Sequence, residues 1–277
     1  MSSGALPHVD PPVRPADVAQ AGVWLAGHDL TGATPTPLLA ARLAVRRRAR
    51  LAAAVLLAAF ICAVALTYVS DLPAGNTAEG FTSHRRWSLA VMAALVAGLV
   101  LAQSLLDRWV RRVDRRAAAT LPRRAAHPVR LGWRTVLGPP RAALTAVTYA
   151  GTAVLAVGAV TMRDPATRYA AVLLLIALGG DAVGMLVQLR HVLTYPAVAD
   201  DEVSLTADVI MRVEDAREVA TPTVVWSLPV VSVFATAPGW WTAAWLVFIV
   251  LGVVALTLIT ARTPRSGAVA RHATTAG

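Results

Sequence analysis

Residues 107–141 read DRWVRRVDRRAAATLPRRAAHPVRLGWRTVLGPPR, with ten arginines against two aspartates. Long apolar runs flank this stretch on both sides, over 87–106 and 142–162. Short segments rich in arginine resist translocation across a membrane, so the helices beside them orient to keep them in the cytoplasm. The stretch therefore predicts a basic cytoplasmic loop between two membrane-spanning helices, and the orientation of the other helices follows from it.

The composition places the chain in the membrane class. Of its 277 residues, 56% are apolar and only 15% are charged. All 26 basic residues are arginine, and the net charge is +10. In a soluble protein that charge would suggest nucleic-acid binding, but here the arginines lie beside apolar runs and no recognition motif accompanies them. We therefore predict no nucleic-acid partner, and expect the basic inner surface to contact anionic lipid head groups.

Six stretches are apolar and long enough to cross a hydrocarbon layer of about 30 Å. They cover about 51–69, 87–106, 142–162, 169–189, 221–237 and 240–261. The sequence thus predicts an all-α fold, a polytopic integral membrane bundle of six transmembrane helices. The fifth stretch is the weakest, because it is short and contains Trp226, Ser227 and Pro229. Pro229 frees a backbone carbonyl and predicts a kink.

The distribution of arginine tests this layout. Only four of the 26 arginines, Arg85, Arg86, Arg163 and Arg168, fall on the predicted outer side, which leaves 22 on the cytoplasmic side. A re-entrant fifth stretch would reverse the last helix and place the basic C-terminal tail outside, against the positive-inside rule. We therefore predict a multi-pass protein of the cell membrane with its N-terminus and C-terminus both cytoplasmic.

The two ends of the chain flank a membrane domain over 42–261. The N-terminal segment, 1–41, is predicted to be a mostly disordered cytoplasmic tail. The alternative is a short helix between Ala16 and Leu30 that lies at the membrane interface. The C-terminal segment, 262–277, contains three arginines and is predicted to be a basic cytoplasmic tail.

An acidic segment follows the fourth span. Residues 190–221 contain seven acids against three arginines, and the apolar positions recur at helical spacing over about 204–220. This pattern predicts an amphipathic cytoplasmic helix in which Asp208 pairs with Arg212 one turn on. We expect the helix to dock on the basic loop, with Glu214 near Arg123.

Asp181 is the most informative single residue, because it lies inside the fourth predicted span. A charge near the bilayer centre costs about 2.5 to 3.5 kcal/mol unless it is paired or hydrated, so something must compensate for it. Three interpretations are open: a neutral acid hydrogen-bonded in the bundle, an ion pair with an arginine from the cytoplasmic side, or part of a proton or solute path. Gln103, at comparable depth in the second span, is a candidate partner.

Small residues spaced four apart predict close helix packing in a membrane. Gly180 and Gly184 form such a pair in the fourth span, and Gly98 lies on a stripe of alanines in the second. We expect helix contacts at these three glycines.

Catalytic motifs are absent from the sequence. No two histidines have metal-ligand spacing, neither HExxH nor GxSxG occurs, and the lack of lysine excludes a phosphate-loop lysine. We therefore predict no enzyme and no catalytic, cofactor-binding or metal site. The leading prediction is a protein of the transport class, a permease-like subunit whose ATPase or regulatory partner is a separate chain. The alternatives are a non-transporting membrane scaffold or regulator, and an intramembrane lipid-modifying enzyme that would use Asp200, Asp201, Glu202 and Asp208.

Overall fold

The computed structural model describes residues 14–71, 81–120, 132–194, 202–228 and 239–275. The described residues contain no strand and form the helices α1 (Pro15–Gly27), α2 (Pro37–Asp71), α3 (Phe81–Thr120), α4 (Trp133–Val136), α5 (Pro139–Val160), α6 (Pro165–Thr194), α7 (Glu202–Val219), α8 (Thr223–Ser227), α9 (Gly239–Arg262) and α10 (Ser266–Thr275). The all-α prediction is therefore confirmed.

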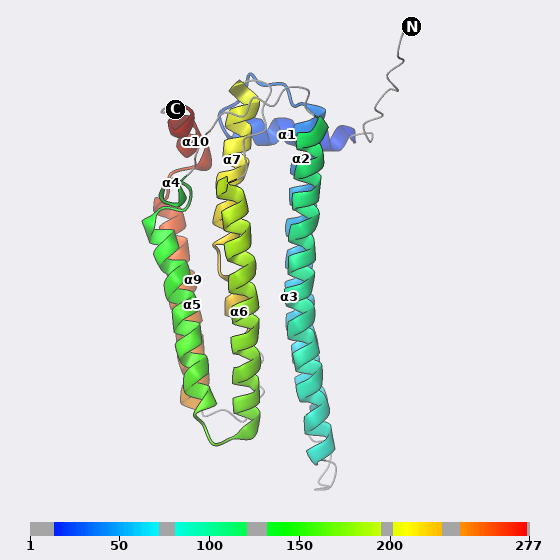
Figure 1. The fold of residues 1–277 in the computed structure, drawn as a ribbon, viewed down its shortest axis with the longest axis vertical. Coiled ribbons are helices and arrows are strands. Elements are labelled where there is room, and N and C mark those ends of the chain that lie inside the picture. Colours follow the sequence, from blue (N-terminus) through cyan, green and yellow to red (C-terminus); the bar gives the residue numbers. More distant parts are fainter. Residues whose placement is uncertain (1–13, 72–80, 121–131, 195–201, 229–238, 276–277) are drawn as a thin grey trace.

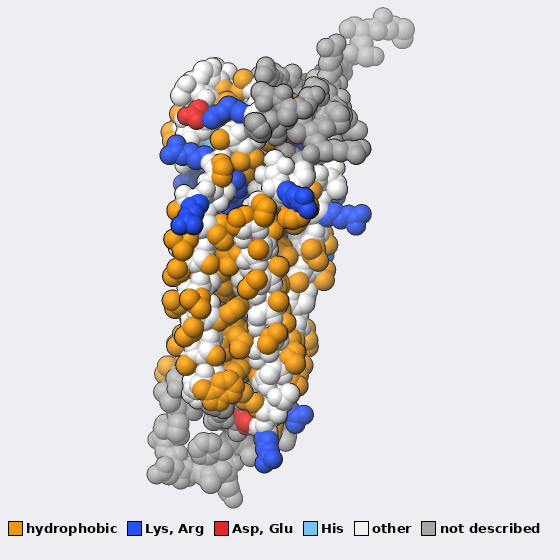
Figure 2. All heavy atoms as spheres, turned by 90° about the vertical axis from the view of Figure 1, so that its left-hand side faces the viewer, with side chains coloured by type: hydrophobic (Ala, Val, Ile, Leu, Met, Phe, Trp, Pro, Cys, Tyr) orange, Lys and Arg blue, Asp and Glu red, His pale blue; other side chains and the backbone are white. Residues whose placement is uncertain are grey.

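Five of these helices, α2, α3, α5, α6 and α9, are long and apolar enough to cross a membrane. They run along one common direction (Figure 1). Large apolar side chains such as Leu66, Val154 and Ile176 are exposed on the surfaces of these helices. Figure 2 shows an extended apolar band with arginines toward both of its ends. Soluble proteins rarely expose so large an apolar surface, so the chain is a polytopic membrane protein.

The fifth predicted span, 221–237, does not form a spanning helix in the part that the structure describes. Only α8 lies there, and it ends at Ser227. Residues 229–237, including the predicted kink at Pro229, lie outside the described residues. The structure therefore supports five of the six predicted spans by length and composition.

Two hydrogen bonds to α5 locate the two ends of the segment between Ala220 and Trp241. The hydroxyl of Thr145 donates a hydrogen bond to the carbonyl of Ala220, just after α7. The indole of Trp241, near the start of α9, donates to the carbonyl of Leu155 at 3.4 Å. Thr145 and Leu155 are about 15 Å apart along the axis of α5 by helical rise. The chain therefore returns toward the opposite end of the bundle between Ala220 and Trp241.

The short helices α1, α4 and α10 gather with α7 at one end of the bundle, and α1 lies across the long helices (Figure 1). Residues 15–27 of the predicted disordered tail thus form a helix, as in the interfacial alternative. This helix is fixed by the burial of Ala21 and Leu25 and by a hydrogen bond of 2.9 Å between His28 and Glu214 of α7. Part of the predicted C-terminal tail likewise forms α10, which packs against α7.

Local sequence explains where several helices begin. Proline stands at the first position of α1, α2, α5 and α6, where the missing N–H costs no helical hydrogen bond. Gly138, just before α5, has a φ of +74°, a left-handed conformation that favours glycine. The carboxylate of Asp164 caps α6 by accepting hydrogen bonds from the backbone N–H and the hydroxyl of Thr167.

Among the described glycines, Gly151 and Gly252 leave the least space for a Cβ atom, and the sequence pattern singled out neither of them. A Cβ added to Gly151 on α5 would lie 2.6 Å from Cε2 of Phe248 on α9. A Cβ added to Gly252 on α9 would lie 2.8 Å from Cζ2 of Trp226 on α8. Real Cβ atoms do not approach so closely, so both glycines are needed to seat an aromatic ring.

The three predicted packing glycines differ from one another in their surroundings. A Cβ added to Gly98 or Gly184 would meet no heavy atom of the described residues within 4 Å, so neither marks a close contact inside the bundle. Gly180 alone has a neighbour, Val100 of α3, at 3.4 Å. Gly184 has no such neighbour because it faces a cavity and not the surface of a second helix.

Candidate functional site

A cavity of about 420 Å³ lies between α2, α3, α6 and α7, and residues of α5 and just after α7 complete its wall. Polar side chains in a membrane interior are costly, so many of them facing one space indicate a functional site. The polar and charged residues that line this cavity are Arg46, Arg50, Gln103, Ser104, Asp107, Arg111, Asp114, Tyr149, Asp181, Gln188, His191, Asp215, Glu218, Thr221 and Thr223.

Asp181 lies at the inner end of this cavity, near the middle of α6. By helical rise it is about 24 Å from Pro165 and about 20 Å from Thr194. Its carboxylate accepts a hydrogen bond from the hydroxyl of Tyr149 on α5. The described partner of Asp181 is thus a hydroxyl and not a guanidinium, and no sequence pattern predicts Tyr149 as that partner. Gln103, the expected partner, lines the same cavity from α3.

Further polar groups connect Asp181 to the end of the bundle where α1 and α10 lie. Asp107 and Arg111 line the cavity from successive turns of α3, and Gln188 and His191 line it from α6. Because both helices run toward that end, polar side chains recur along the cavity wall among apolar ones such as Leu57 and Met185. Such a wall can hold water or a small polar solute.

A network of ion pairs forms the outer part of the site. Arg42, Arg46 and Arg50 are spaced four apart and therefore share one face of α2. Arg42 binds Asp208 at 2.6 Å and Asp114 at 3.0 Å. This face of α2 therefore forms ion pairs with acidic side chains of both α7 and α3.

Arg46 lies at the centre of the network. It binds both carboxylate oxygens of Asp114, at 3.0 and 2.8 Å, and Asp215 at 2.8 Å. Arg50 then pairs with Asp215 at 3.7 Å and also with Glu218. The described groups of this part of the cavity are therefore paired with one another across three helices.

The network is balanced in charge. Arg42, Arg46, Arg50 and Arg212 supply four positive charges, and Asp114, Asp208, Asp215 and Glu218 supply four negative charges. Asp208 is completely buried, and Arg46 is only 7% exposed. Burial raises the pKa of the Asp215 and Glu218 carboxyls, and the arginines beside them partly offset the rise. Pairing makes the burial of these charges tolerable.

The acidic helix contacts the described part of the basic loop and also the start of α2, which the sequence did not predict as a partner. α7 covers Glu202–Val219, near the predicted 204–220, and the expected pair between Asp208 and Arg212 is present at 2.8 Å. However, residues 206–213 are all buried, so this part of the helix has no solvated face. Its described ion pairs to α2 join Asp208 and Asp215 to Arg42 and Arg46. Arg217 of α7 also donates a hydrogen bond to the carbonyl of Val136 in the basic loop, whereas Arg123 lies outside the described residues.

The chemistry of a metal-dependent lipid enzyme finds no support in the described part of the chain. No group of three or more histidine, cysteine, aspartate or glutamate side chains there could hold a metal ion. Asp208 is bound by Arg42 and Arg212, which occupies its carboxylate. Asp200 and Asp201 lie outside the described residues.

Comparisons with known proteins return no relatives. No protein-family model matches the sequence, and no curated protein and no solved structure matches it significantly. The geometry of the cavity therefore carries the functional conclusion.

Proposed function

We propose that this protein belongs to the transport class and moves protons across a membrane, and that the cavity between α2, α3, α6 and α7 is the part of the path that leads to Asp181. The single observation that carries the proposal is the series of polar side chains along this cavity, from the ion-pair network to the Asp181–Tyr149 hydrogen bond near the middle of α6. Acids and histidines inside membrane segments mark proton relays and solute pathways more often than structural sites.

The dimensions of the cavity support this function. A liquid water molecule takes about 30 Å³, so a cavity of about 420 Å³ has room for a chain of waters or for one small polar solute. Asp107 and His191 stand between the network and Asp181 and are able to exchange protons with such waters. The ion pairs of Arg46 and Arg50 keep the outer wall charged without leaving a free charge in the membrane.

The orientation of the path is part of the proposal. We assign the end that holds α1 and α10 to the cytoplasm, because the positive-inside rule places the arginine-rich side there. Reporter fusions after Thr120, Val203 and Ala268 should all fluoresce in the cytosol and show no activity as exported phosphatase. Phosphatase activity from any of the three would contradict this orientation.

Proton movement can be measured with the full chain in liposomes that contain a pH-sensitive dye. The wild-type protein should dissipate an imposed pH gradient. Asp181→Asn keeps the size of the side chain but removes the titratable group, so it should abolish most of this flux. Tyr149→Phe removes only the hydroxyl that binds Asp181 and should reduce the flux less.

Asp29→Asn is the matched control. Asp29 is 73% exposed and lies outside the cavity. Its φ of +63° is well tolerated by asparagine. This variant should transport like the wild type. A wild-type protein that leaves the gradient intact would overturn the proposal in favour of a non-transporting scaffold or regulator, and equal flux in the wild type and in D181N would remove Asp181 from the path.

A further inference from the structure

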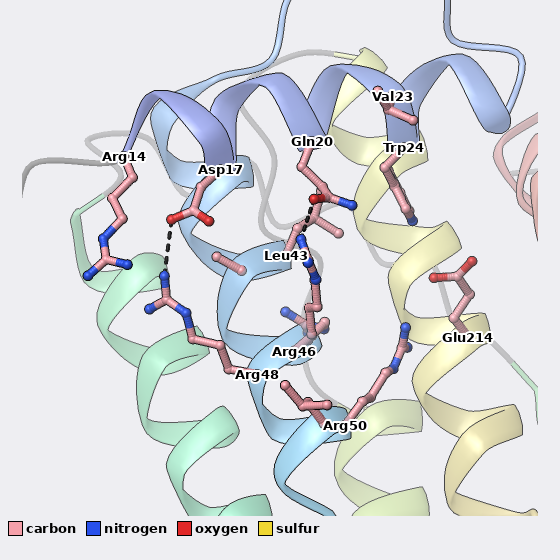
Figure 3. Close-up of a pocket in the computed structure, with 13 residues that line it drawn as sticks. Arg14, Asp17, Gln20, Val23, Trp24, Leu43, Arg46, Arg48, Arg50 and Glu214 are labelled. Atoms are coloured by element: carbon pink, nitrogen blue, oxygen red, sulfur yellow. Dashed lines mark hydrogen bonds and ion pairs between the residues drawn. The ribbon is translucent and has the colours of Figure 1, made fainter. Parts of the chain in front are cut away.

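A second cavity, of about 560 Å³, lies between α1, the start of α2 and α7 (Figure 3). Gln20 and Trp24 of α1 point into it from one side, and Arg46 and Arg50 lie on the opposite side. This cavity is distinct from the proposed proton path, although Arg46 and Arg50 border both.

The lining of this second cavity has an excess of positive charge. It contains five arginines against two acids, Asp17 and Glu214. Arg46 and Arg50 are neutralised by the network described above, and Arg48 pairs with Asp17 at 3.1 Å. These pairs leave two arginines of the cavity to account for.

Arg14 and Arg47 are those two arginines. Arg47 donates a hydrogen bond to the neutral side chain of Gln20. Within the described residues, neither Arg14 nor Arg47 has a carboxylate at salt-bridge distance, and both are exposed. Arg14, just before α1, and Arg47 of α2 both line this cavity, and their positive charge favours an anion with several oxygen acceptors, such as a phosphate group.

The surface below Arg47 is apolar. Arg47, Leu51 and Val55 are spaced four apart and therefore lie on one stripe of α2. Leu51 and Val55 are 66% and 59% exposed, and Leu51 also lines the cavity. An anion held at Arg47 would thus sit directly above an apolar strip of a membrane-spanning helix, which is the arrangement of a phospholipid head group and its acyl chains.

We propose that the cavity between α1 and α2 binds the phosphate of an anionic phospholipid, with Arg14 and Arg47 as its ligands and the acyl chains along Leu51 and Val55. The proposal stands on the second cavity alone and is independent of proton transport. Basic pockets between helices near a membrane surface are the usual way in which proteins bind such head groups. α1 then acts as the lid of a lipid site as well as a part of the fold.

The test uses the purified full chain with equimolar phosphatidylglycerol and phosphatidylcholine, and native mass spectrometry counts the lipid that stays bound. The wild-type protein should retain phosphatidylglycerol in preference. The double variant Arg14→Gln/Arg47→Gln should bind it roughly 30-fold more weakly, which corresponds to about 1 kcal/mol for each guanidinium. Arg47→Gln alone should weaken binding roughly 5-fold and gives a second reading if the double variant is unstable.

Arg262→Gln/Arg265→Gln is the matched control, because it removes two exposed arginines outside the cavity, one at the end of α9 and one just after it. It should keep the preference for phosphatidylglycerol. An equal loss in this control would mean that only overall charge matters, and would overturn the site. Equal retention of the two lipids by the wild type would overturn it as well. Displacement of the lipid by an equal concentration of glycerol phosphate would identify a free-phosphate site instead.

Discussion

Arg46→Met tests whether the ion-pair network holds α2, α3 and α7 together. The Arg46 guanidinium makes three hydrogen bonds of 2.8 to 3.0 Å to Asp114 and Asp215. Methionine fills a similar volume with an adaptable apolar side chain, so the change removes the charge and leaves little empty space. Asp114 would keep Arg42, but Asp215 would keep only Arg50, which is 3.7 Å away.

Burial sets the size of the effect. Arg46 is 7% exposed and its two acids are about one-fifth exposed. Removing one partner from a buried ion pair costs about 3 to 5 kcal/mol, because the other charge is left without compensation. Arg48→Met makes the same substitution two residues away at a side chain that is 51% exposed and pairs only with Asp17. An exposed pair of this kind contributes about 0 to 1 kcal/mol.

Thermal unfolding in detergent, followed by intrinsic tryptophan fluorescence, compares these two variants with the wild type. At about 2 to 4 °C per kcal/mol for a chain of roughly this size, Arg46→Met should lower the Tm by roughly 6 to 20 °C. Arg48→Met should lower it by at most about 4 °C. Adding Asp215→Asn to Arg46→Met should recover part of the loss, because the uncompensated acid is then removed. If both single variants unfold at the wild-type temperature, the network does not stabilise the fold.

Two further changes test contacts elsewhere in the chain. Gly252→Ala places a Cβ 2.8 Å from Trp226 and should destabilise the protein by about 1 to 3 kcal/mol in the same unfolding assay. Gly158→Ala has open space and should be neutral or stabilising by up to about 1 kcal/mol, so equal losses in the two would contradict the packing argument. His28→Ala removes the link to Glu214 and should speed hydrogen exchange in the backbone of α1. Unchanged exchange there would show that packing alone holds that helix.

The five long helices could be predicted from the sequence because an apolar run is a local property of the chain. The predicted boundaries are shorter than the helices, since α2 begins at Pro37 and α3 continues to Thr120. Both extensions are rich in arginine, and ion pairs join them to each other at the end of the bundle, where the start of α2 also pairs with α7 and packs on α1. A hydropathy pattern does not report that kind of contact.

Partners distant in the sequence could not be predicted. Helical periodicity shows which residues share a face, but it does not show which helix that face meets. Tyr149 is 32 residues from Asp181, and nothing in the sequence pairs α5 with α6 at that depth. Arg42, Arg46 and Arg50 share one face of α2, but the sequence does not show that this face meets the acids of α7.

The packing glycines show a second limit of sequence patterns. The rule of small residues spaced four apart assumes that two helix backbones approach each other. Gly151 and Gly252 instead make room for the rings of Phe248 and Trp226, and a single glycine is enough for that. No spacing rule identifies such a position without knowledge of the facing helix.

The order of synthesis gives the network at the start of α2 a second consequence. Asp114 follows Arg46 by 68 residues, and Asp208 and Asp215 follow Arg42 and Arg46 by 166 and 169. At about 5 to 20 residues per second, the last of these acids leave the ribosome roughly 8 to 34 s after the arginines. Arg42 and Arg46 have no acid of this network beside them until Asp114 emerges, and they are only partly neutralised until α7 follows. During that time they lie next to the first apolar helix, where they direct insertion. The acids of α7 then complete the neutralisation of these arginines. The charges that direct insertion of the nascent chain thus become part of the ion-pair network of the folded bundle.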